Sequence, residues 1–167
     1  LRAGLVVGAG GSSFEIVRKL TRRLPWMICP SWTQTRTQPV HIADVMEAFE
    51  KSIQEEEIAP GTYDLGVTDP ISYIGILQKA ASMMHLKRRF LTVPVFSAKL
   101  SRRWVSLVTN TPFELVAPLI ESLREPMLVR ETHRFPLARA PRCLESALDE
   151  ALEAVPSRVV PRATVVA

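Results

Sequence analysis

The chain has 167 residues, of which 47% are hydrophobic, and its 21 basic and 17 acidic residues give a formal net charge of +4. This length fits one domain or a piece of one, and the apolar fraction excludes disorder along the whole chain. No run of five or six like charges occurs, so the positive charge predicts no nucleic-acid partner.

Strands alternate with helices along the chain, and this order predicts an α/β fold with parallel strand pairing in its first part. The chain starts inside a strand, at Leu1 rather than at Met, so we expect a fragment of a longer protein. The predicted strands are 1–7, 26–32, 61–66 and 88–94, and the predicted helices are 12–24, 42–53, 70–84, one from Ser97, one from Thr111 that is kinked at Pro118, and 143–155.

Helix starts and buried faces follow from residue types and spacing. Ser12 or Ser13 is the expected N-cap of the first helix, and Asp69 is the expected N-cap of the third, with Pro70 as its first residue. In the second helix an apolar stripe repeats every three or four residues and predicts the buried face. This stripe consists of Ile42, Val45, Met46, Phe49 and Ile53.

The two cysteines, Cys29 and Cys143, have no companion cluster of histidines or further cysteines. Neither a zinc site nor a disulfide framework is therefore predicted, and a reducing compartment, the cytoplasm, is favoured. No signal peptide and no uninterrupted apolar run of bilayer length occurs, so we expect no membrane partner.

The glycine turn GAGG follows the first strand and precedes a helix, which is the outline of a phosphate-binding βα unit. A dinucleotide fingerprint needs G-x-G-x-x-G and an acidic residue about 20 positions later. Gly8 and Gly10 fit, but Ser13 stands at the third glycine position, and the segment 26–34 has no acidic residue. The fingerprint is incomplete, and a plain strand-to-helix turn is the favoured interpretation.

Other polar residues have two interpretations. His41 and Asp44, three positions apart, suit a catalytic dyad or a structural strand-to-helix junction, and the junction is favoured. The basic residues near aromatic side chains suit an anionic surface or solvated helix ends, and solvated ends are favoured. They are Arg88, Arg89, Arg102 and Arg103.

Three segments in this order resemble the C-terminal half of the extended and atypical short-chain dehydrogenase/reductases, the nucleoside-diphosphate-sugar epimerase-like, NAD(P)H-binding family. They are LRAGLVVGAGGSSFEIV, TRTQPVHIADVMEAFEKSI and GTYDLGVTDPISYIGIL. The resemblance implies that residues 1–130 are the substrate-side portion of a Rossmann-like domain. It also implies that residues 131–167 are a polar linker and a helix that lead to a further domain.

The resemblance implies site residues as well. Ala3, Gly4 and Leu5 would lie closest to the nicotinamide of the cofactor. An Arg near position 36 grips a diphosphate in related sugar-nucleotide enzymes, but here Thr37 fills the expected place. The implied substrate-binding residues, with Tyr73 as a further pocket residue, are Gly8, Gly10, Gly11, Ser12, Ser13, Phe14, Trp32, Arg36, Thr37 and Gln38.

The family's chemistry needs a Tyr-x-x-x-Lys pair, in which the lysine lowers the pKa of the phenol. Val67 and Leu77 stand four residues after Tyr63 and Tyr73, so these 167 residues hold no such pair. We therefore expect NAD or NADP and a small-molecule substrate to bind the full-length parent, and no cofactor or activity for this chain alone.

The rival interpretation is a non-catalytic binding or interaction module on the same scaffold. In either case half a fold would expose strand edges, and a homo-oligomer formed through those edges is expected.

Overall fold

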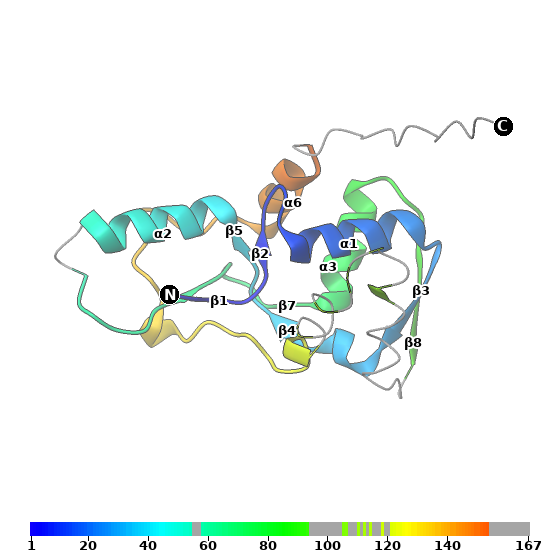
Figure 1. The fold of residues 1–167 in the computed structure, drawn as a ribbon, viewed down its shortest axis with the longest axis horizontal. Helices are drawn as coiled ribbons and strands as arrows, with labels where there is room; N and C mark the ends of the chain where they lie inside the picture. Colours follow the sequence, from blue (N-terminus) through cyan, green and yellow to red (C-terminus); the bar gives the residue numbers. More distant parts are fainter. Residues whose placement is uncertain are drawn as a thin grey trace.

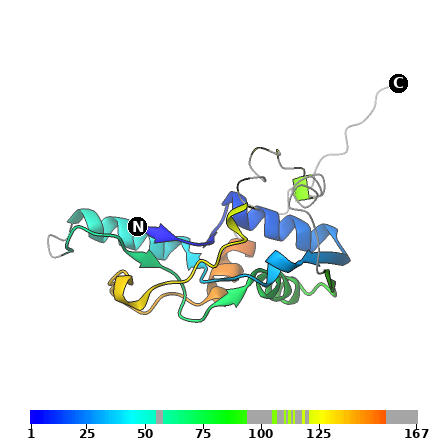
Figure 2. The same ribbon diagram turned by 90° about the horizontal axis from the view of Figure 1, so that it is seen from below.

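The computed structural model describes residues 1–54, 58–93, 105–106, 110, 112, 114, 118 and 121–153. Figures 1 and 2 show its elements along the chain in two views. The strands are β1 (Arg2–Ala3), β2 (Val6–Val7), β3 (Trp26–Pro30), β4 (Arg36–Thr37), β5 (Val40–His41), β6 (Asp64–Leu65), β7 (Ile71–Ser72) and β8 (Arg89–Val93). The helices are α1 (Ser12–Arg23), α2 (Ile42–Gln54), α3 (Tyr73–Met83) and α6 (Leu144–Glu153), with short 3₁₀ turns η1 (Ser31–Gln34) and η2 (Glu131–His133).

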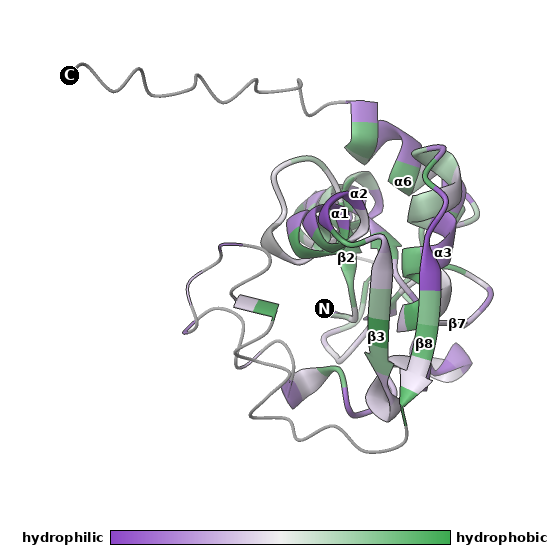
Figure 3. Ribbon diagram, turned by 90° about the vertical axis from the view of Figure 1, so that its right-hand side faces the viewer, coloured by the Kyte–Doolittle hydropathy of each residue, from purple (hydrophilic) through white to green (hydrophobic). Residues whose placement is uncertain are grey.

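The strands form pairs, and three of the four pairs in the described residues are parallel: β1 with β6, β2 with β5, and β3 with β8. The fourth pair, β4 with β7, is antiparallel. Figure 3 shows β3 and β8 running side by side. The predicted α/β class and the parallel pairing are confirmed. The first predicted strand is divided into β1 and β2, and each half pairs with a different partner strand.

Helix α1 forms as its apolar spacing predicts and ends one residue before Leu24, whose backbone N–H bonds to the carbonyl of Leu20. The predicted N-cap is wrong. Gly11 occupies that position without a side-chain cap bond, and Ser12 and Ser13 are already helical. The chain turns one step earlier because Gly10 has a φ of +78°, a conformation that suits glycine.

The predicted buried face of α2 is wrong. Ile42, Met46 and Ile53 are 41%, 60% and 84% exposed, whereas Asp44 and Ala48 are buried. The reason is an ion pair between Asp44 and Arg142, a residue far along the chain, which turns the polar side of the helix inward. In Figure 1, α2 extends away from the part of the molecule that holds α1 and α3.

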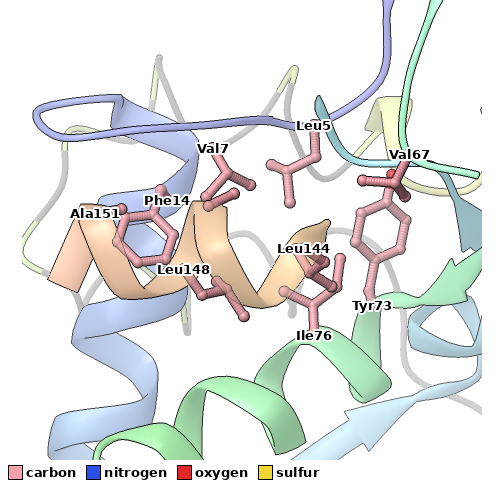
Figure 4. Close-up of a cluster of buried hydrophobic side chains, with 10 residues drawn as sticks. Leu5, Val7, Phe14, Val67, Tyr73, Ile76, Leu144, Leu148 and Ala151 are labelled. Atoms are coloured by element: carbon pink, nitrogen blue, oxygen red, sulfur yellow. The ribbon is translucent and has the colours of Figure 1, made fainter. Parts of the chain in front are cut away.

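Two of the four hydrophobic clusters in the described residues contain the most buried side chains. The larger one joins α1, α3, α6 and β2, and Figure 4 shows its side chains converging. The smaller one, beneath α2, contains Val40, Ala48, Leu65 and Phe135. The ring of Phe135 meets that of Tyr63 edge-on, with centroids 5.5 Å apart.

The predicted helix at 143–155 is confirmed as α6, with Leu144, Ala147, Leu148 and Ala151 buried. Residues 131–153 thus contribute to both clusters, and a further domain beyond them stays a prediction. The helices predicted from Ser97 and Thr111 and the last segment, 156–167, lie largely outside the described residues.

Helix α3 begins later than predicted. Asp69 and Pro70 precede β7, and Ser72 is the N-cap, its Oγ accepting a hydrogen bond from the backbone N–H of Gly75 at 3.2 Å. Removing this cap in a Ser72→Ala variant is expected to lower the free energy of unfolding by about 0.5–2 kcal/mol. Urea denaturation followed by circular dichroism measures the change.

Ser52→Ala is the control, because Ser52 bonds only to the Ala48 carbonyl of its own helix in the described residues. It is expected to leave stability nearly unchanged, since such bonds add little to a helix. Equal effects of the two substitutions would contradict a capping role for Ser72.

Candidate functional site

An apolar cavity of about 80 Å³ lies between α1, η1 and α3. Aliphatic side chains form most of its lining, among them Leu5, Ile16, Val17, Leu20, Ile76 and Leu77. Ser13, Trp32, Thr33 and Tyr73 also line it, almost entirely with carbon atoms. Among the described residues no charged side chain lines it.

Two short connections position Trp32 and Tyr73 on this cavity. Thr33 donates its hydroxyl proton to the carbonyl of Pro30 at 2.7 Å, which stabilises the single turn of η1. The backbone N–H of Tyr73 bonds to the carbonyl of Thr35 at 3.3 Å, and this bond joins the start of α3 to the end of η1. Hydrogen bonds to backbone carbonyls therefore fix η1, which carries Trp32, and the start of α3, which carries Tyr73.

Three buried polar atoms have no hydrogen-bond partner among the described residues: Trp32 Nε1, Thr37 Oγ1 and Tyr73 Oη. Thr37 does not line the cavity, and the other two atoms present almost no surface to it. Burial raises the pKa of Tyr73, and the Thr37 hydroxyl, which lies nearby without hydrogen-bond geometry, acts in the opposite direction. The phenol is thus protonated at neutral pH and is a donor. An unpaired buried group of this kind costs about 1–3 kcal/mol.

The residues that the resemblance places near a cofactor divide between two hollows. Leu5 lines the apolar cavity, whereas Ala3 and Gly4 line a separate hollow of about 380 Å³ beside Asp64. A Cβ atom on Gly4 would lie 2.8 Å from Thr37 Oγ1, so a larger residue at this position would require the Thr37 side chain to move.

The predicted substrate-binding residues of the glycine turn also separate. Ser13 lines the apolar cavity, but Gly8 lines a third hollow together with His41 and Glu150. Gly10 and Gly11 line none of these hollows, and the side chain of Ser12 is outside the described set. Phe14 is fully buried in the larger hydrophobic cluster and does not face the cavity.

The cluster Arg36 to Gln38 binds backbone rather than the cavity. Arg36 is exposed and donates to the carbonyl of Pro70 at 3.0 Å. Gln38 is buried, donates to the carbonyls of Val67 and Thr68 at 2.8 and 3.0 Å, and accepts from the backbone N–H of Val129 at 2.6 Å. The amide of Gln38 therefore joins three chain segments.

His41 and Asp44 bind different partners, as the structural interpretation predicts. His41 Nδ1 accepts from the backbone N–H of Ala43 at 2.9 Å, so Nε2 carries the proton toward Glu150 at 3.0 Å. The carboxylate of Asp44 accepts from the backbone N–H of Arg142 at 2.9 Å and pairs with its guanidinium.

Among the basic residues, Arg88 donates to the carbonyls of Thr21 and Arg22, which satisfies the C-terminus of α1. The guanidinium of Arg89 lies 4.8 Å from the ring centroid of Trp26. Arg102 and Arg103 are outside the described residues. The first two are therefore engaged as helix-end and stacking groups.

The part of the chain that the structure describes lacks the side-chain arrangements that metal or thiolate chemistry needs. No group of three or more histidine, cysteine or acidic side chains is arranged to hold a metal ion there. Burial raises the pKa of the Cys29 thiol to about 11, so it is not a thiolate nucleophile at neutral pH. None of the described helices is both long and apolar enough to span a bilayer.

Asp64, at the hollow beside Gly4, has a lowered pKa because Arg130 bonds to its carboxylate through Nε at 2.9 Å and through its backbone N–H at 3.1 Å. A lowered folded-state pKa stabilises the fold above the unfolded value of about 3.9, and this contribution is lost as the pH falls through the folded value. We expect the urea midpoint of the wild type to fall more steeply than that of Asp64→Asn between about pH 5 and 2.

Glu131→Gln is the matched control for this pH experiment. Glu131 is 74% exposed in its pair with Arg134, so its loss is expected to change the pH profile little. Equal slopes for the wild type and Asp64→Asn would show that the Asp64 pair does not contribute to acid sensitivity.

Sequence reasoning missed part of the cavity lining. Thr33 and Ile76 carry no motif, whereas Val17, Leu20 and Leu77 stand at the helical spacing of an apolar face. The pairing of Asp64 with Arg130 has no local signal, because 65 residues separate the two. Only the convergence of distant segments reveals these contacts.

No protein-family model matches the sequence, and no curated protein does. The chain is similar in structure to a dTDP-4-dehydrorhamnose reductase of Bacillus anthracis solved with NADP, with a TM-score of 0.57 and 15% identity, over 92% of this chain and 47% of that one. A structure described as gox2253 matches with a TM-score of 0.53 and 16% identity, over 89% and 46% of the two chains. The chain thus spans about half the length of these structures, and over that half it shares their α/β fold.

Proposed function

We propose that this chain forms the substrate-side part of an NAD(P)-dependent oxidoreductase or nucleoside-diphosphate-sugar epimerase-like protein. The observation that carries the proposal is the cavity between α1, η1 and α3, which brings Leu5, Ser13, Trp32 and Tyr73 together. Each of these residues comes from a segment that resembles the substrate side of the family or lies beside one. The shared fold supports the same placement.

The cavity would exclude water from a bound substrate because its lining is aliphatic. In the parent, NAD or NADP would supply hydride exchange with an organic carbonyl or alcohol. On this chain Gly4, whose strand passes close to Thr37, would lie toward the cofactor.

Proton transfer is not assigned to Tyr73, since Leu77 rather than lysine follows it by four residues. Its raised pKa suits a hydrogen-bond donor rather than an activated acid. The catalytic Tyr and Lys would belong to another part of the parent, and this chain alone is expected to be inactive.

The test is to titrate the purified chain with NADH and NADPH, following the tryptophan fluorescence and that of the cofactor. The proposal expects no saturable binding at millimolar cofactor. Saturable binding would overturn it, because the GAGG turn would then hold phosphate and the chain would be a cofactor-binding half.

A second candidate function is a non-catalytic binding module. The specific observation in its favour is that the described part of the chain forms the cavity without any other subunit. The sequence of a longer product of the same gene would distinguish the two functions. The enzyme requires upstream residues that bind NADPH and carry Tyr-x-x-x-Lys, whereas the binding module does not.

We also propose a reducing compartment, the cytoplasm, since Cys29 is buried, Cys143 is exposed and both are free. Association into a homo-oligomer through strand edges stays a prediction, and light scattering on the purified chain would test it. A monodisperse monomer would count against it.

A further inference from the structure

We propose that the cavity between α1, η1 and α3 binds the aliphatic end, about three or four carbon atoms long, of an amphiphilic molecule. The polar part of that molecule would remain in solvent. This gives a substrate class to the proposed function and rests on that proposal only where the molecule is called a substrate. Binding itself depends on the residues of this chain alone.

The lining presents almost only carbon to the space. Helices α1 and α3 both contribute aliphatic side chains to it, among them Leu20 and Leu77. The hydroxyl of Thr33, a further lining residue, is bonded to the carbonyl of Pro30 at 2.7 Å. No charged side chain among the described residues lines the cavity. An ionised group inside would therefore have no partner, and its burial would be strongly unfavourable.

The same lining disfavours water in the cavity. A buried water molecule typically makes about three hydrogen bonds to polar groups of the protein, and an apolar cavity stays dry. The lining here offers almost no polar surface. A hydrocarbon group therefore enters without displacing bound water. Each methylene group that leaves bulk water for the cavity tightens binding about fourfold.

The volume of the cavity sets the length of the bound end. A dry cavity of about 150 Å³ holds benzene, which has six non-hydrogen atoms. The cavity here measures about 80 Å³, so it holds about three or four such atoms. A propyl or butyl group fits this space, whereas an aromatic ring or a sugar nucleotide does not.

The cavity is not enclosed, so the rest of a longer molecule can stay outside it. Ile16, Val17, Leu20 and Leu77 line the cavity and are half-buried rather than fully buried. The end of a chain can therefore enter from solvent. A chain longer than the cavity leaves its remaining carbon atoms and its polar group in water.

The experiment titrates the 1-alkanols from 1-propanol to 1-heptanol into the ¹⁵N-labelled chain. It follows the indole N–H signal of Trp32, which lines the cavity and is assigned from its absence in Trp32→Phe. Affinity is expected to rise about fourfold with each carbon as far as 1-butanol or 1-pentanol. From there to 1-heptanol it is expected to stay within about twofold, because the additional methylene groups remain in water.

Two variants change the volume of the cavity in opposite directions. Leu77→Ala enlarges it and is expected to move the plateau to chains about two or three carbons longer. Val17→Phe reduces it from the side of α1 and is expected to weaken the binding of 1-butanol more than about tenfold. The matched control is Leu91→Ala, because Leu91 is 56% exposed on β8 and does not line the cavity. It is expected to keep the wild-type plateau, and circular dichroism checks the fold of each variant.

No saturable shift of the wild type would overturn the inference. An affinity that continues to rise about fourfold per carbon up to 1-heptanol would do the same, since the alcohols would then bind a surface of unlimited length. An unchanged plateau in a folded Leu77→Ala variant, or undiminished binding in a folded Val17→Phe variant, would also reject it. The cofactor titration fails independently: saturable NADPH binding together with a plateau would remove the proposed function and leave the apolar site standing. A chain that binds neither NADPH nor the alcohols would lose the apolar site alone.

Discussion

A Phe14→Ala variant is expected to lose about 3–5 kcal/mol of unfolding free energy, the cost of removing a fully buried aromatic side chain. Phe14 is 0% exposed and belongs to the cluster that joins α1, α6 and β2. Figure 4 shows its ring beside Ala151 and Leu148 of α6. Urea denaturation followed by circular dichroism measures the loss.

Phe14→Leu is the matched control, because leucine keeps an apolar group of similar size in the cluster and is expected to cost less than half as much. A Phe14→Ala variant as stable as the wild type would reject the role of Phe14 in the core.

The helices were predictable where apolar spacing alone determines them. In α1 and α6 apolar residues repeat every three or four positions, and the structure buries Phe14 of α1 and Leu144, Ala147 and Leu148 of α6, as expected. Helix starts were less predictable because several residues near each start can serve as a cap. Ser72 caps α3 and Asp69 does not, since β7 lies between Pro70 and the helix.

Helix α2 shows why spacing fails when a long-range polar partner decides the orientation. The apolar stripe runs along most of the helix. Ala48 is the one residue of α2 that is buried in the smaller hydrophobic cluster. Asp44 is 1% exposed because Arg142 neutralises it, and no local pattern indicates an arginine 98 residues away. The ion pair therefore outweighs the hydrophobic preference of the sequence.

The candidate site was also predictable only in part, because some of its contacts join residues that are far apart in the sequence. The cavity brings Leu5, Ser13, Trp32 and Tyr73 together. The strand predicted over 26–32 ends at Pro30, and Trp32 lies in η1 instead. Gln38 looked like a ligand-binding residue since it is polar and follows Arg36. Its partners are backbone atoms of residues 67, 68 and 129, which only the folded chain brings near it.

Removing the ion pair between Asp44 and Arg142 is the second change that we expect to lower the free energy of unfolding strongly. An Asp44→Ala variant is expected to lose about 3–5 kcal/mol of unfolding free energy, because the guanidinium and the backbone N–H of Arg142 then lose their acceptor in a buried place. Urea denaturation at neutral pH provides the measurement, with circular dichroism as the signal.

Glu47→Ala on the same helix is the control. Glu47 accepts from the backbone N–H of Ala138 at 2.9 Å and lies 3.9 Å from the guanidinium of Arg139, at a more exposed position, so its loss is expected to cost about 1 kcal/mol or less. The double variant Asp44→Leu with Arg142→Met removes both charges and is expected to recover much of the lost stability, since apolar side chains can replace a buried ion pair. An Asp44→Ala variant as stable as Glu47→Ala would show that apolar packing, and not this pair, turns α2 toward the core.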